Sequence, residues 1–512
     1  MGRRIRWLGV VLTVCFGLVI VQLTNIQYRR ASALSTSPDN PVNRIPNFDN
    51  DRGDIFAANG TLLATSVRIA PSGSNTYEFQ RQYPTGSLFA QIVGTCSPFY
   101  CNTGVEGYYS GELGLHKQAA QNLSQLLSPP SPTTDAITLT VDPTLQQDAV
   151  NELNSLPGAN KDGAVVMLNI HTGAILEMVS SPTYDPTPLV STNEQTESSA
   201  ETADKTNDSE GFSPLDPIAT FNPIEMGSTA KVITTSAIYN LDPSLASFDF
   251  PTSVCVSIPQ TDKPICNDAD TASESGTPCG GTIVAMLPQS CDPGYAELGV
   301  KLGGTLLNEQ ATMFGFDSTP PLDLDPESDV AGHVVQPSEY PTAQELSPTG
   351  SLGIPGDAFS AFGQQDVLAT ALQNAMVAAG IANKGAVMVP HFLEKITNAQ
   401  GQVVETYQPK VWKQATSAQA AAEVIPLMEA VAKSDGTAAG VDFPPSLDVA
   451  VKTGTAQVGT PVTSAADWMI GLAPASNPEV AIAVVVPKQS LDSTGALVAG
   501  PIVKAMLEAA LG

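Results

Sequence analysis

The sequence predicts an α+β protein, in which an antiparallel β-sheet flanked by helices is preceded by a small β-rich domain and an N-terminal transmembrane helix. Three observations lead to this fold class. A basic N-terminus precedes an uncharged apolar run, short strand-like segments joined by tight turns follow it, and longer apolar strands alternate with helical segments in the remaining chain. The 512 residues are enough for more than one domain with a sizeable core.

The N-terminus predicts export across a membrane. Arginines at positions 3, 4 and 6 precede Trp7–Leu23, an apolar run that approaches the length of a bilayer span, so the basic side should stay cytoplasmic. We expect a cytoplasmic tail at 1–6, a transmembrane anchor at 7–25 and a linker at 26–45. A cleaved signal peptide is the alternative, because Ala31-Ser32-Ala33 fits a peptidase site, although two arginines directly precede that triplet. Both alternatives place the rest of the chain outside the cytoplasm.

The charge of the chain excludes one class of partner. Fifty-one acidic residues against 23 basic ones give a formal net charge of -28, which repels nucleic acid, so no nucleic-acid partner is expected. No arginine follows Arg81. An anion bound beyond that position must therefore be held by lysine, hydroxyl groups or backbone amides. No cofactor or metal is expected.

The cysteines agree with export. One lies in the apolar run, and the other six are Cys96, Cys101, Cys255, Cys266, Cys279 and Cys291. An even number in an exported chain predicts disulfides, and the absence of Cys-x-x-Cys spacing argues against zinc. Cys96 with Cys101 forms the obvious local loop, whereas the other four allow three pairings that the sequence does not separate.

A β-rich pedestal domain is predicted at 46–134. Asp51–Phe56 and Thr61–Ala64 read as strands joined by the tight-turn pair Asn59-Gly60. Three prolines within 128–134 mark its end.

The second domain is predicted at 135–512. It opens on a strand at Ala136–Val141, followed by a helix with Asp142 as N-cap and a proline at its first position. Two apolar strands follow at Gly163–Ile170 and Ala174–Ser180. The acidic stretch 191–211 has almost no large apolar side chain, so we expect a disordered insertion there.

The first chemical motif is Ser228-Thr229-Ala230-Lys231. The apolar spacing after it predicts a buried helix, on which Lys231 lies one turn from Ser228. A lysine can accept the serine proton only when it is neutral, which requires burial or a second positive charge nearby. A capping serine beside a surface lysine is the simpler interpretation of this motif taken alone.

The second motif, Lys452-Thr453-Gly454-Thr455, favours chemistry over that simpler interpretation. It ends a predicted strand that Asp467–Leu472 and Val480–Val486 extend into an antiparallel sheet. Lys452 would supply the second positive charge, and Gly454 would leave space beside the strand for a bound peptide. An edge-strand lysine that discourages aggregation would explain Lys452 but not the two threonines. Together the motifs indicate a serine acyl-transfer site.

These motifs, in this order, resemble those of class B penicillin-binding proteins, the monofunctional peptidoglycan D,D-transpeptidases. The resemblance rests also on Gly163–Val166, Ser180–Pro186, Gln373–Met388, Met428–Ala438 and the Arg52–Ile55 hairpin, and it covers nearly all of residues 50–490. It implies a β-lactamase-like transpeptidase domain on an N-terminal pedestal.

The resemblance also implies roles for the residues. Ser228 would attack the D-Ala-D-Ala amide of a stem peptide and Lys231 would accept its proton. Backbone amides of Ser228 and Thr455 would form the oxyanion hole. Thr453, Gly454 and Thr455 would hold the terminal carboxylate, and Lys452 would supply the positive field.

The sequence departs from the family at its second motif, Ser-x-Asn. The best match is Ser290-Cys291-Asp292, in which Ser290 could still relay a proton. A carboxylate beside Lys231 would favour the ammonium and oppose its service as base. Either Asp292, placed among the substrate-binding residues, faces Lys452, or the catalytic proton balance differs. The plain alternative is that Cys291 closes a disulfide and Asp292 caps a turn.

The expected protein is a single-pass protein of a bacterial cell membrane with an extracytoplasmic catalytic domain. Its expected partners are stem peptides, β-lactam antibiotics, the membrane, and a glycosyltransferase or divisome protein. Two alternatives use the same motifs: a carboxypeptidase or β-lactamase-like hydrolase, and a non-catalytic β-lactam-binding scaffold. The only Glu-x-x-x-Asn that could serve a β-lactamase, Glu394–Asn398, reads as part of a hairpin, which argues against the hydrolase.

Overall fold

The computed structural model describes residues 48–70, 77–101, 103–116, 132–158, 160–206, 208, 211–267, 276–324, 334–459 and 462–512, with residues 7, 12–13, 15–19 and 22 near the N-terminus. Within these ranges, no helix combines the length and the apolar character that a bilayer span requires. The predicted tail, anchor and linker at 1–45 fall mostly outside the described residues.

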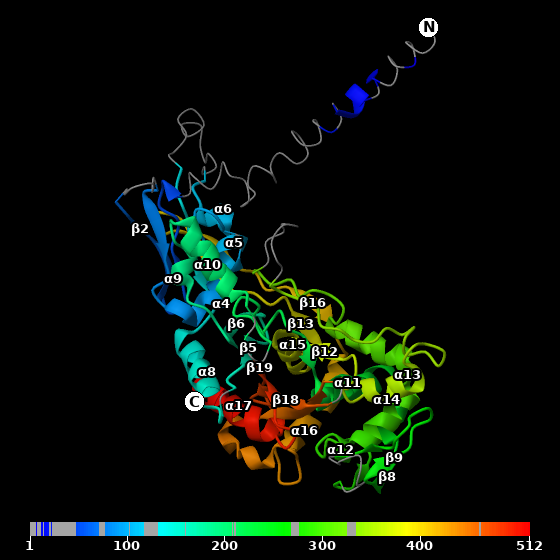
Figure 1. Ribbon diagram of the computed structural model, residues 1–512. Coiled ribbons are helices and arrows are strands. Elements are labelled where there is room, and N and C mark those ends of the chain that lie inside the picture. The colour runs from blue at the N-terminus through cyan, green and yellow to red at the C-terminus, as the bar shows by residue number, and fades with distance from the viewer. Residues whose placement is uncertain are drawn as a thin grey trace.

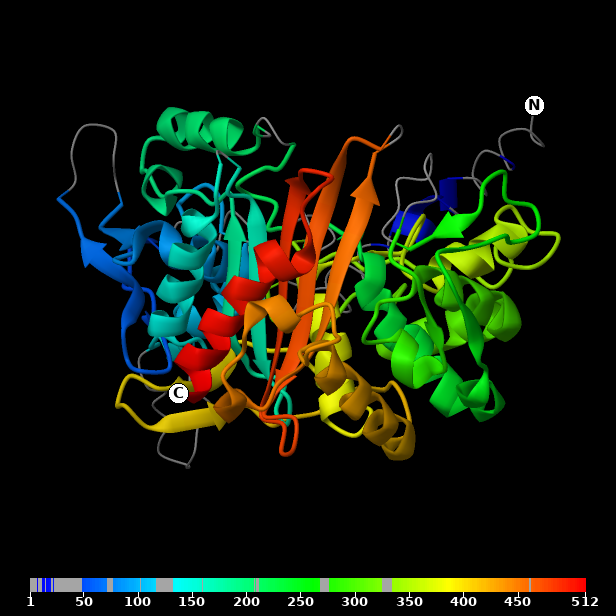
Figure 2. The same ribbon diagram turned by 90° about the horizontal axis from the view of Figure 1, so that it is seen from below.

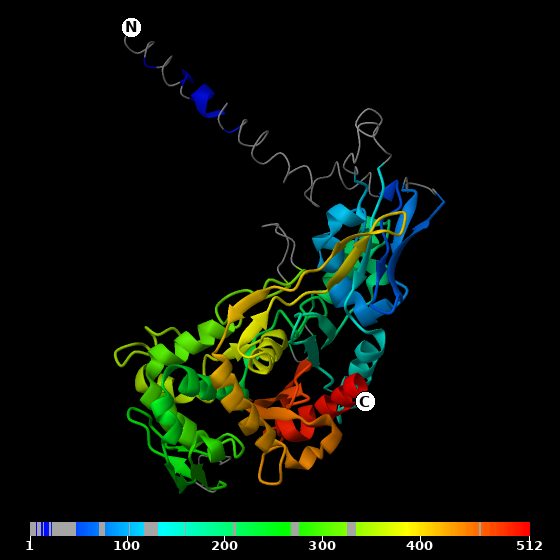
Figure 3. The ribbon, with the colours of Figure 1, turned by 180° about the vertical axis from the view of Figure 1, so that it is seen from behind.

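A six-stranded sheet lies at one end of the molecule, around the strand labelled β2 in Figure 1, with the strand order β15-β14-β4-β1-β2-β3. Its strands are β1 (Ile55–Phe56), β2 (Leu62–Arg68), β3 (Phe79–Gln82), β4 (Ala136–Leu139), β14 (Leu393–Thr397) and β15 (Val403–Thr406). The predicted pedestal hairpin is confirmed, because β1 pairs antiparallel with β2. The predicted Glu394–Asn398 hairpin is confirmed too, and Figure 3 shows it reaching from the other half of the chain. The predicted boundary at 134/135 therefore runs through one shared sheet.

The pedestal also has four short helices, η2 (Gly86–Phe89), α4 (Ala90–Val93), α5 (Gly104–Tyr108) and α6 (Ser110–Leu113), and a buried ion cluster joins its strands to α5. Arg52 Nε lies 2.7 Å and Arg81 Nε 2.5 Å from the carboxylate of Glu106, and all three side chains are buried. Burial alone would raise the pKa of Glu106, but the Arg81 and Arg52 guanidiniums lower it below its usual value. The pairing keeps three charged side chains stable in the domain interior.

A five-stranded antiparallel sheet, with the order β17-β18-β19-β5-β6, forms the centre of the second domain. Its strands are β5 (Gly163–Asn169), β6 (Ile175–Ser181), β17 (Ala450–Val458), β18 (Ser464–Ala473) and β19 (Val480–Gln489). The predicted antiparallel sheet is confirmed. Because β17 is an edge strand, some of its backbone amides face away from the sheet and are free to pair with a ligand.

Helices cover both faces of this sheet. On one face lie α8 (Pro143–Ser155) and α17 (Gly495–Leu511), and on the other α15 (Ala371–Ala382); Figure 2 shows α17 crossing the strands. Helix α11 (Lys231–Leu241) packs among the helices beside this sheet. Asp142 caps α8 as predicted, accepting from Thr144 N at 2.7 Å. Buried apolar side chains fill both layers between sheet and helices.

A helical lobe beside β17 completes the domain. Its helices are η3 (Gly227–Ala230), η4 (Pro243–Ser247), α12 (Ile283–Met286), α13 (Asp292–Phe314), α14 (Gly353–Ser360), α16 (Ala418–Val431), η5 (Ala439–Val441) and η6 (Pro445–Leu447). Its short strands are β7 (Ile224–Glu225), β8 (Phe250–Ser253), β9 (Cys255–Val256), β10 (Ile265–Cys266), β11 (Cys279–Gly281), β12 (Leu368–Ala369), β13 (Ala386–Met388) and β16 (Val411–Gln414).

The acidic stretch 191–211 is partly helical, so the predicted disorder is wrong for most of it. The short α9 (Pro186–Leu189) leads into α10 (Glu194–Asp204), where Asn193 caps the helix by accepting from Gln195 N at 3.0 Å. Glu197 is buried and accepts a hydrogen bond from Ser97 of the pedestal. A cap and a contact with another part of the chain order this segment, and neither depends on the large apolar side chains that it lacks.

Three disulfides are present. Cys96 bonds to Cys101 as predicted. The other four cysteines, for which the sequence left three pairings undecided, form the disulfides Cys255–Cys266 and Cys279–Cys291. The first of these joins the paired strands β9 and β10, and the second ties β11 to the start of α13.

Candidate active site

Ser228 and Lys231 lie where a short 3-10 helix, η3, continues into α11. Their side chains meet as the motif predicts, with Lys231 Nζ 2.9 Å from Ser228 Oγ. Lys231 is fully buried and Ser228 is half-buried. The preceding Gly227 has φ of 53°, and a Cβ there would lie 2.8 Å from Ala456 N of β17. The glycine therefore allows the serine to sit directly against the edge strand.

Ser290 and Asp292 approach the same lysine from the loop before α13. Lys231 Nζ lies 3.1 Å from Ser290 Oγ and 2.6 Å from the Ser290 carbonyl oxygen. It also forms an ion pair with Asp292 Oδ1. Of the two alternatives left open by the sequence, Asp292 thus faces Lys231 and not Lys452. Asp292 was predicted to be one of the substrate-binding residues. Its carboxylate is instead directed at Lys231, the candidate base.

Lys452 reaches the site from β17 and completes the cluster. Its Nζ lies 2.9 Å from Ser290 Oγ and 2.8 Å from the Thr453 carbonyl oxygen, and the side chain is fully buried. Ser290 Oγ is therefore shared by two lysine amines. Ser228, Lys231, Ser290 and Lys452 form a continuous series of contacts, which we call the amine–hydroxyl chain.

The hydrogen-bond acceptors around the Lys231 amine outnumber the protons that it can donate. As an ammonium it has three N–H groups, yet Ser228 Oγ, the two Ser290 oxygens and the Asp292 carboxylate all lie within hydrogen-bond distance. Loss of one proton would leave a lone pair that could accept from Ser228. Asp292 opposes that loss, and the neighbouring amine of Lys452 promotes it. The charge state of Lys231 is thus set by two opposed neighbours.

The Asp292 backbone is held independently of its carboxylate. Its N–H donates to Asn267 Oδ1 at 3.1 Å, and Asn267 itself is buried. The Asp292 side chain is 26% exposed, so water reaches the ion pair from one side. Asn267 belongs to no motif in the sequence and was not predicted.

Gly454 has a different role from the predicted one. A Cβ at this position would lie 2.9 Å from Met226 O and 2.9 Å from Thr229 Cγ2. The space beside Gly454 is therefore filled by the segment that carries Ser228. The glycine brings strand and helix together, and does not leave room for a peptide.

The two threonines of the motif leave β17 on the face opposite the Cβ of Lys452, and the long Lys452 side chain brings its Nζ to 3.5 Å from Thr453 Oγ1. Thr453 Oγ1 lies 2.6 Å from Thr437 Oγ1, and Thr455 Oγ1 accepts from Gly495 N at 3.2 Å. Both threonines lie on the edge strand of the sheet. The contact of Thr437 with Thr453 was not predicted from spacing.

Aromatic rings close the inner wall behind Lys231. Its Nζ lies 5.4 Å from the centre of the Tyr295 ring and 6.0 Å from that of Phe362. Burial raises the pKa of Tyr295, whose hydroxyl lies 2.6 Å from Thr235 Oγ1. Ring faces attract a cation, so this wall favours the ammonium form of Lys231. Tyr295 and Phe362 belong to no sequence motif and were not predicted, because this wall forms only where elements that are distant in sequence come into contact.

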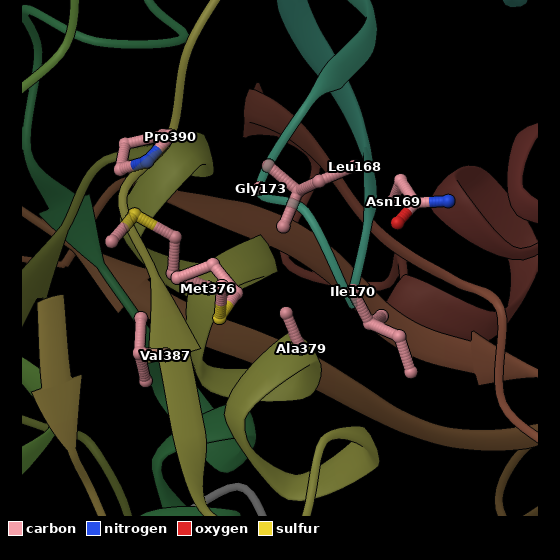
Figure 4. A pocket seen from close by; sticks show the side chains of 9 residues that line it. Leu168, Asn169, Ile170, Gly173, Met376, Ala379, Val387 and Pro390 are labelled. Atoms are coloured by element: carbon pink, nitrogen blue, oxygen red, sulfur yellow. The ribbon is translucent and has the colours of Figure 1, made fainter. Parts of the chain in front are cut away.

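The small cavity in Figure 4 is not part of this site. It has a volume of about 10 Å³, which is room for one water at most. It lies between the β5–β6 turn and the α15–β13 segment, among apolar side chains such as Ile170 and Met376. The amine–hydroxyl chain lies elsewhere, at the junction of η3, α13 and β17.

Two family models match the chain. One, described as penicillin binding protein transpeptidase domain, matches residues 163–508 and includes every residue of the amine–hydroxyl chain. The other, described as penicillin binding protein A dimerisation domain, matches residues 52–136.

Relatives match over the full length. The chain is 32% identical over 525 residues to the peptidoglycan D,D-transpeptidase PbpA of Mycolicibacterium smegmatis, with 100% of this chain and 99% of the relative covered. The corresponding protein of Mycobacterium tuberculosis is 31% identical with the same coverage. Among solved structures, penicillin-binding protein A of M. tuberculosis as a ceftriaxone acyl-enzyme matches with a TM-score of 0.77 at 29% identity, covering 91% of this chain and 100% of that one. Its penicillin G acyl-enzyme matches with a TM-score of 0.74 at the same identity.

Proposed function

Because this chain belongs to the penicillin-binding protein transpeptidase family, we propose that the amine–hydroxyl chain is its catalytic centre. The protein is a class B peptidoglycan D,D-transpeptidase, a serine acyltransferase of cell-wall synthesis that β-lactams acylate. The observation that carries the assignment of residues is the continuous contact from Ser228 Oγ to Lys452 Nζ through Lys231 and Ser290.

Acylation begins at Ser228. Neutral Lys231 takes the hydroxyl proton while Ser228 Oγ forms a bond to the carbonyl carbon between the two terminal D-alanines of the donor stem peptide. The backbone amides of Ser228 and Thr455 stabilise the resulting oxyanion. The amide C–N bond then breaks, and the leaving D-alanine amine receives a proton through Ser290, which contacts both lysines. The product is an ester of Ser228.

Transfer completes the cycle. An amine of a neighbouring stem peptide attacks the carbonyl carbon of the Ser228 ester, and Lys231 accepts a proton from that amine. As the new peptide bond forms, the bond to Ser228 Oγ breaks and Lys231 passes the proton to Ser228 Oγ. The terminal carboxylate of the donor binds before acylation at Thr453 and Thr455, in the positive field of Lys452. This arrangement suits a domain in which no arginine is available to bind an anion.

Labelling with fluorescent penicillin tests the nucleophile. The ectodomain should form a covalent adduct that survives denaturation, and Ser228→Ala should form none while keeping the melting temperature of the parent. Ser155→Ala, at an exposed hydroxyl of α8 outside the amine–hydroxyl chain, should label normally. Equal labelling of Ser228→Ala and the parent protein would contradict the proposal.

Product analysis separates transfer from hydrolysis. A D-Ala-D-Ala donor incubated with an amine acceptor should give mainly the cross-linked peptide and little hydrolysed donor. Hydrolysed donor alone, at saturating acceptor, would favour the carboxypeptidase alternative.

We also propose the placement of the chain in the cell. Residues 1–6 are the cytoplasmic tail, 7–25 a single-pass anchor and 26–45 a linker; 46–134 are the pedestal domain and 135–512 the transpeptidase domain. The basic flank before the apolar run supports this orientation. A transpeptidase without glycan-polymerising activity needs polymerised strands, so we expect a glycosyltransferase or divisome partner. Fractionation of cells that express the full chain and a chain lacking residues 1–25 tests the anchor.

A further inference from the structure

A buried carboxyl group lies directly behind the edge strand of the site. Asp467 is in β18 and its side chain has no solvent exposure. Neither of its carboxyl oxygens makes a hydrogen bond of normal geometry with the residues that the structure describes. Its polar neighbours are the hydroxyls of Thr455 and Ser493, which act on the carboxyl through weak hydrogen bonds.

Asp467 is the cross-strand neighbour of Thr455. The register of β17 and β18 pairs the two residues, so both side chains lie on the same face of the sheet. The start of α17 is pressed onto this face, because a Cβ on Gly495 would lie 2.1 Å from the Trp468 carbonyl oxygen. From there Gly495 N donates to Thr455 Oγ1. The hydroxyl of Thr455 is thereby held beside the Asp467 carboxyl.

The Thr455 hydroxyl has a single proton to donate. Its oxygen already accepts from Gly495 N, so its O–H is the group left for a further bond. Two acceptors compete for that proton: the terminal carboxylate of a donor bound along β17, and an ionised Asp467. A protonated Asp467 does not compete in this way, because its charge is absent.

Asp467 changes its charge near neutral pH. Burial raises its pKa to about 6, against smaller opposite effects of the Ser493 and Thr455 hydroxyls. The charged side chains on the surrounding elements are Lys452, whose amine contacts Ser290 and Thr453, Lys488, which lies over the Phe212 ring, and Asp492, which is exposed in the turn before α17.

We propose that Asp467 is a positioning residue that controls, through Thr455, how well the site accepts an anionic acyl donor. This inference rests on the proposed transpeptidase function. When Asp467 is protonated, the Thr455 O–H is free for the carboxylate of the donor. When Asp467 is ionised, it takes that O–H and repels the carboxylate, so acylation by anionic donors declines as pH rises through about 6.

The test compares the acylation rate constants of Asp467→Asn and the wild-type ectodomain with benzylpenicillin, a carboxylate, at pH 5.0 and 7.5. Both proteins share Lys231, so its own pH dependence cancels in the ratio. We expect the ratio to be near one at pH 5.0 and about ten at pH 7.5, which is the effect of a like charge within a few ångströms. A purely structural defect would instead lower the rate at both pH values.

The methyl ester of benzylpenicillin is the matched reagent, because it lacks the carboxylate. In wild-type protein the rate ratio of penicillin to ester should fall about tenfold over the same pH interval, a result that needs no variant to fold. Normal labelling of Ser228 with rate ratios that do not change with pH would overturn the role of Asp467 alone. Absence of any Ser228 adduct would instead contradict the transpeptidase assignment on which this inference rests.

Discussion

Ser290 is the residue through which the charged groups of the site communicate. Its Oγ lies between the amines of Lys231 and Lys452, and its carbonyl also accepts from Lys231. Its backbone has φ of 53°, a left-handed conformation that is costly for serine. This conformation places both oxygens of one residue on one lysine. Asp292, two residues on, then adds a full negative charge to the same amine.

Removing that charge should change the pH dependence of acylation. In Asp292→Asn the ammonium of Lys231 loses its paired carboxylate, so the neutral amine forms at lower pH. The rising limb of the acylation rate against pH should move to lower pH by about one unit or more. Stopped-flow acylation with a fluorescent penicillin between pH 5 and 9 measures this shift.

The control is Asp262→Asn, which removes one exposed carboxylate of the same lobe without contacting the site. Its profile should match that of the parent protein. If the Asp292→Asn profile also matched the parent, the ion pair would have no influence on the base.

The Cys279–Cys291 disulfide connects the short strand β11 to the start of α13. Cys291 stands between Ser290 and Asp292, so the bond fixes the loop whose residues must meet Lys231. The disulfide closes a short loop and stabilises the fold as well as the site. Its importance for catalysis comes from position, since Cys291 directly follows Ser290, whereas no cysteine of the other two disulfides is next to a residue of the amine–hydroxyl chain.

Replacing both Cys279 and Cys291 by alanine should slow acylation by about tenfold or more, because the loop carrying Ser290 gains freedom and the costly φ is no longer enforced. It should also lower the free energy of unfolding by about 2–3 kcal/mol. Acylation kinetics with penicillin and urea denaturation measure the two effects separately.

The matched variant replaces Cys96 and Cys101, whose disulfide lies in the predicted pedestal domain. It should lower stability while leaving the acylation rate of the folded protein unchanged. Equal slowing in both double variants would mean that general destabilisation, and not loop position, explains the effect.

At the scale of the whole molecule, among the carboxyl groups that the structure describes, those with raised pKa outnumber those with lowered pKa. Burial raises the pKa of Asp357 to about 6, as it does for Asp467. Burial also raises the pKa of others: Asp51, Asp135, Glu177, Asp204, Asp317 and Asp323. The net charge of -28 adds self-repulsion at neutral pH. The fold is therefore better suited to mildly acidic surroundings.

The free energy of unfolding should fall as pH rises from 5.0 to 7.5. Between pH 4 and 6 the folded state binds more protons than the unfolded chain, because the carboxyl groups of the folded state titrate at higher pH. Each rise in pH therefore favours unfolding. The loss should be about 3 kcal/mol, the effect of roughly two pKa units. Urea denaturation at pH 5.0 and 7.5 measures it, and the Asp357→Asn/Asp467→Asn double variant should show a weaker dependence. A free energy that increases over this interval would contradict the expectation.

Much of the architecture could be predicted because local pattern and final structure agree. The strands at 163–170 and 174–180, the Asp142 cap and the pedestal hairpin all follow from periodicity and turn chemistry, which act within a few residues. The acidic helix α10 could not be predicted, since its order comes from an N-cap and from the contact of Glu197 with Ser97. The shared six-stranded sheet was also missed, because its pairing joins residues separated by more than 250 positions.

The catalytic groups were visible in the chain because a nucleophile and its base lie one helical turn apart, a relation that sequence spacing expresses directly. Which residues face that pair depends on packing between elements distant in sequence, and spacing carries no information on it. Only the folded structure shows that Asp292 contacts Lys231, that Gly454 is closed off by Thr229, and that Asp467 is buried behind Thr455. The electrostatics of the site belong to the tertiary structure, because charge interactions depend on distance and burial, and these arise only when β17, α11 and α13 meet.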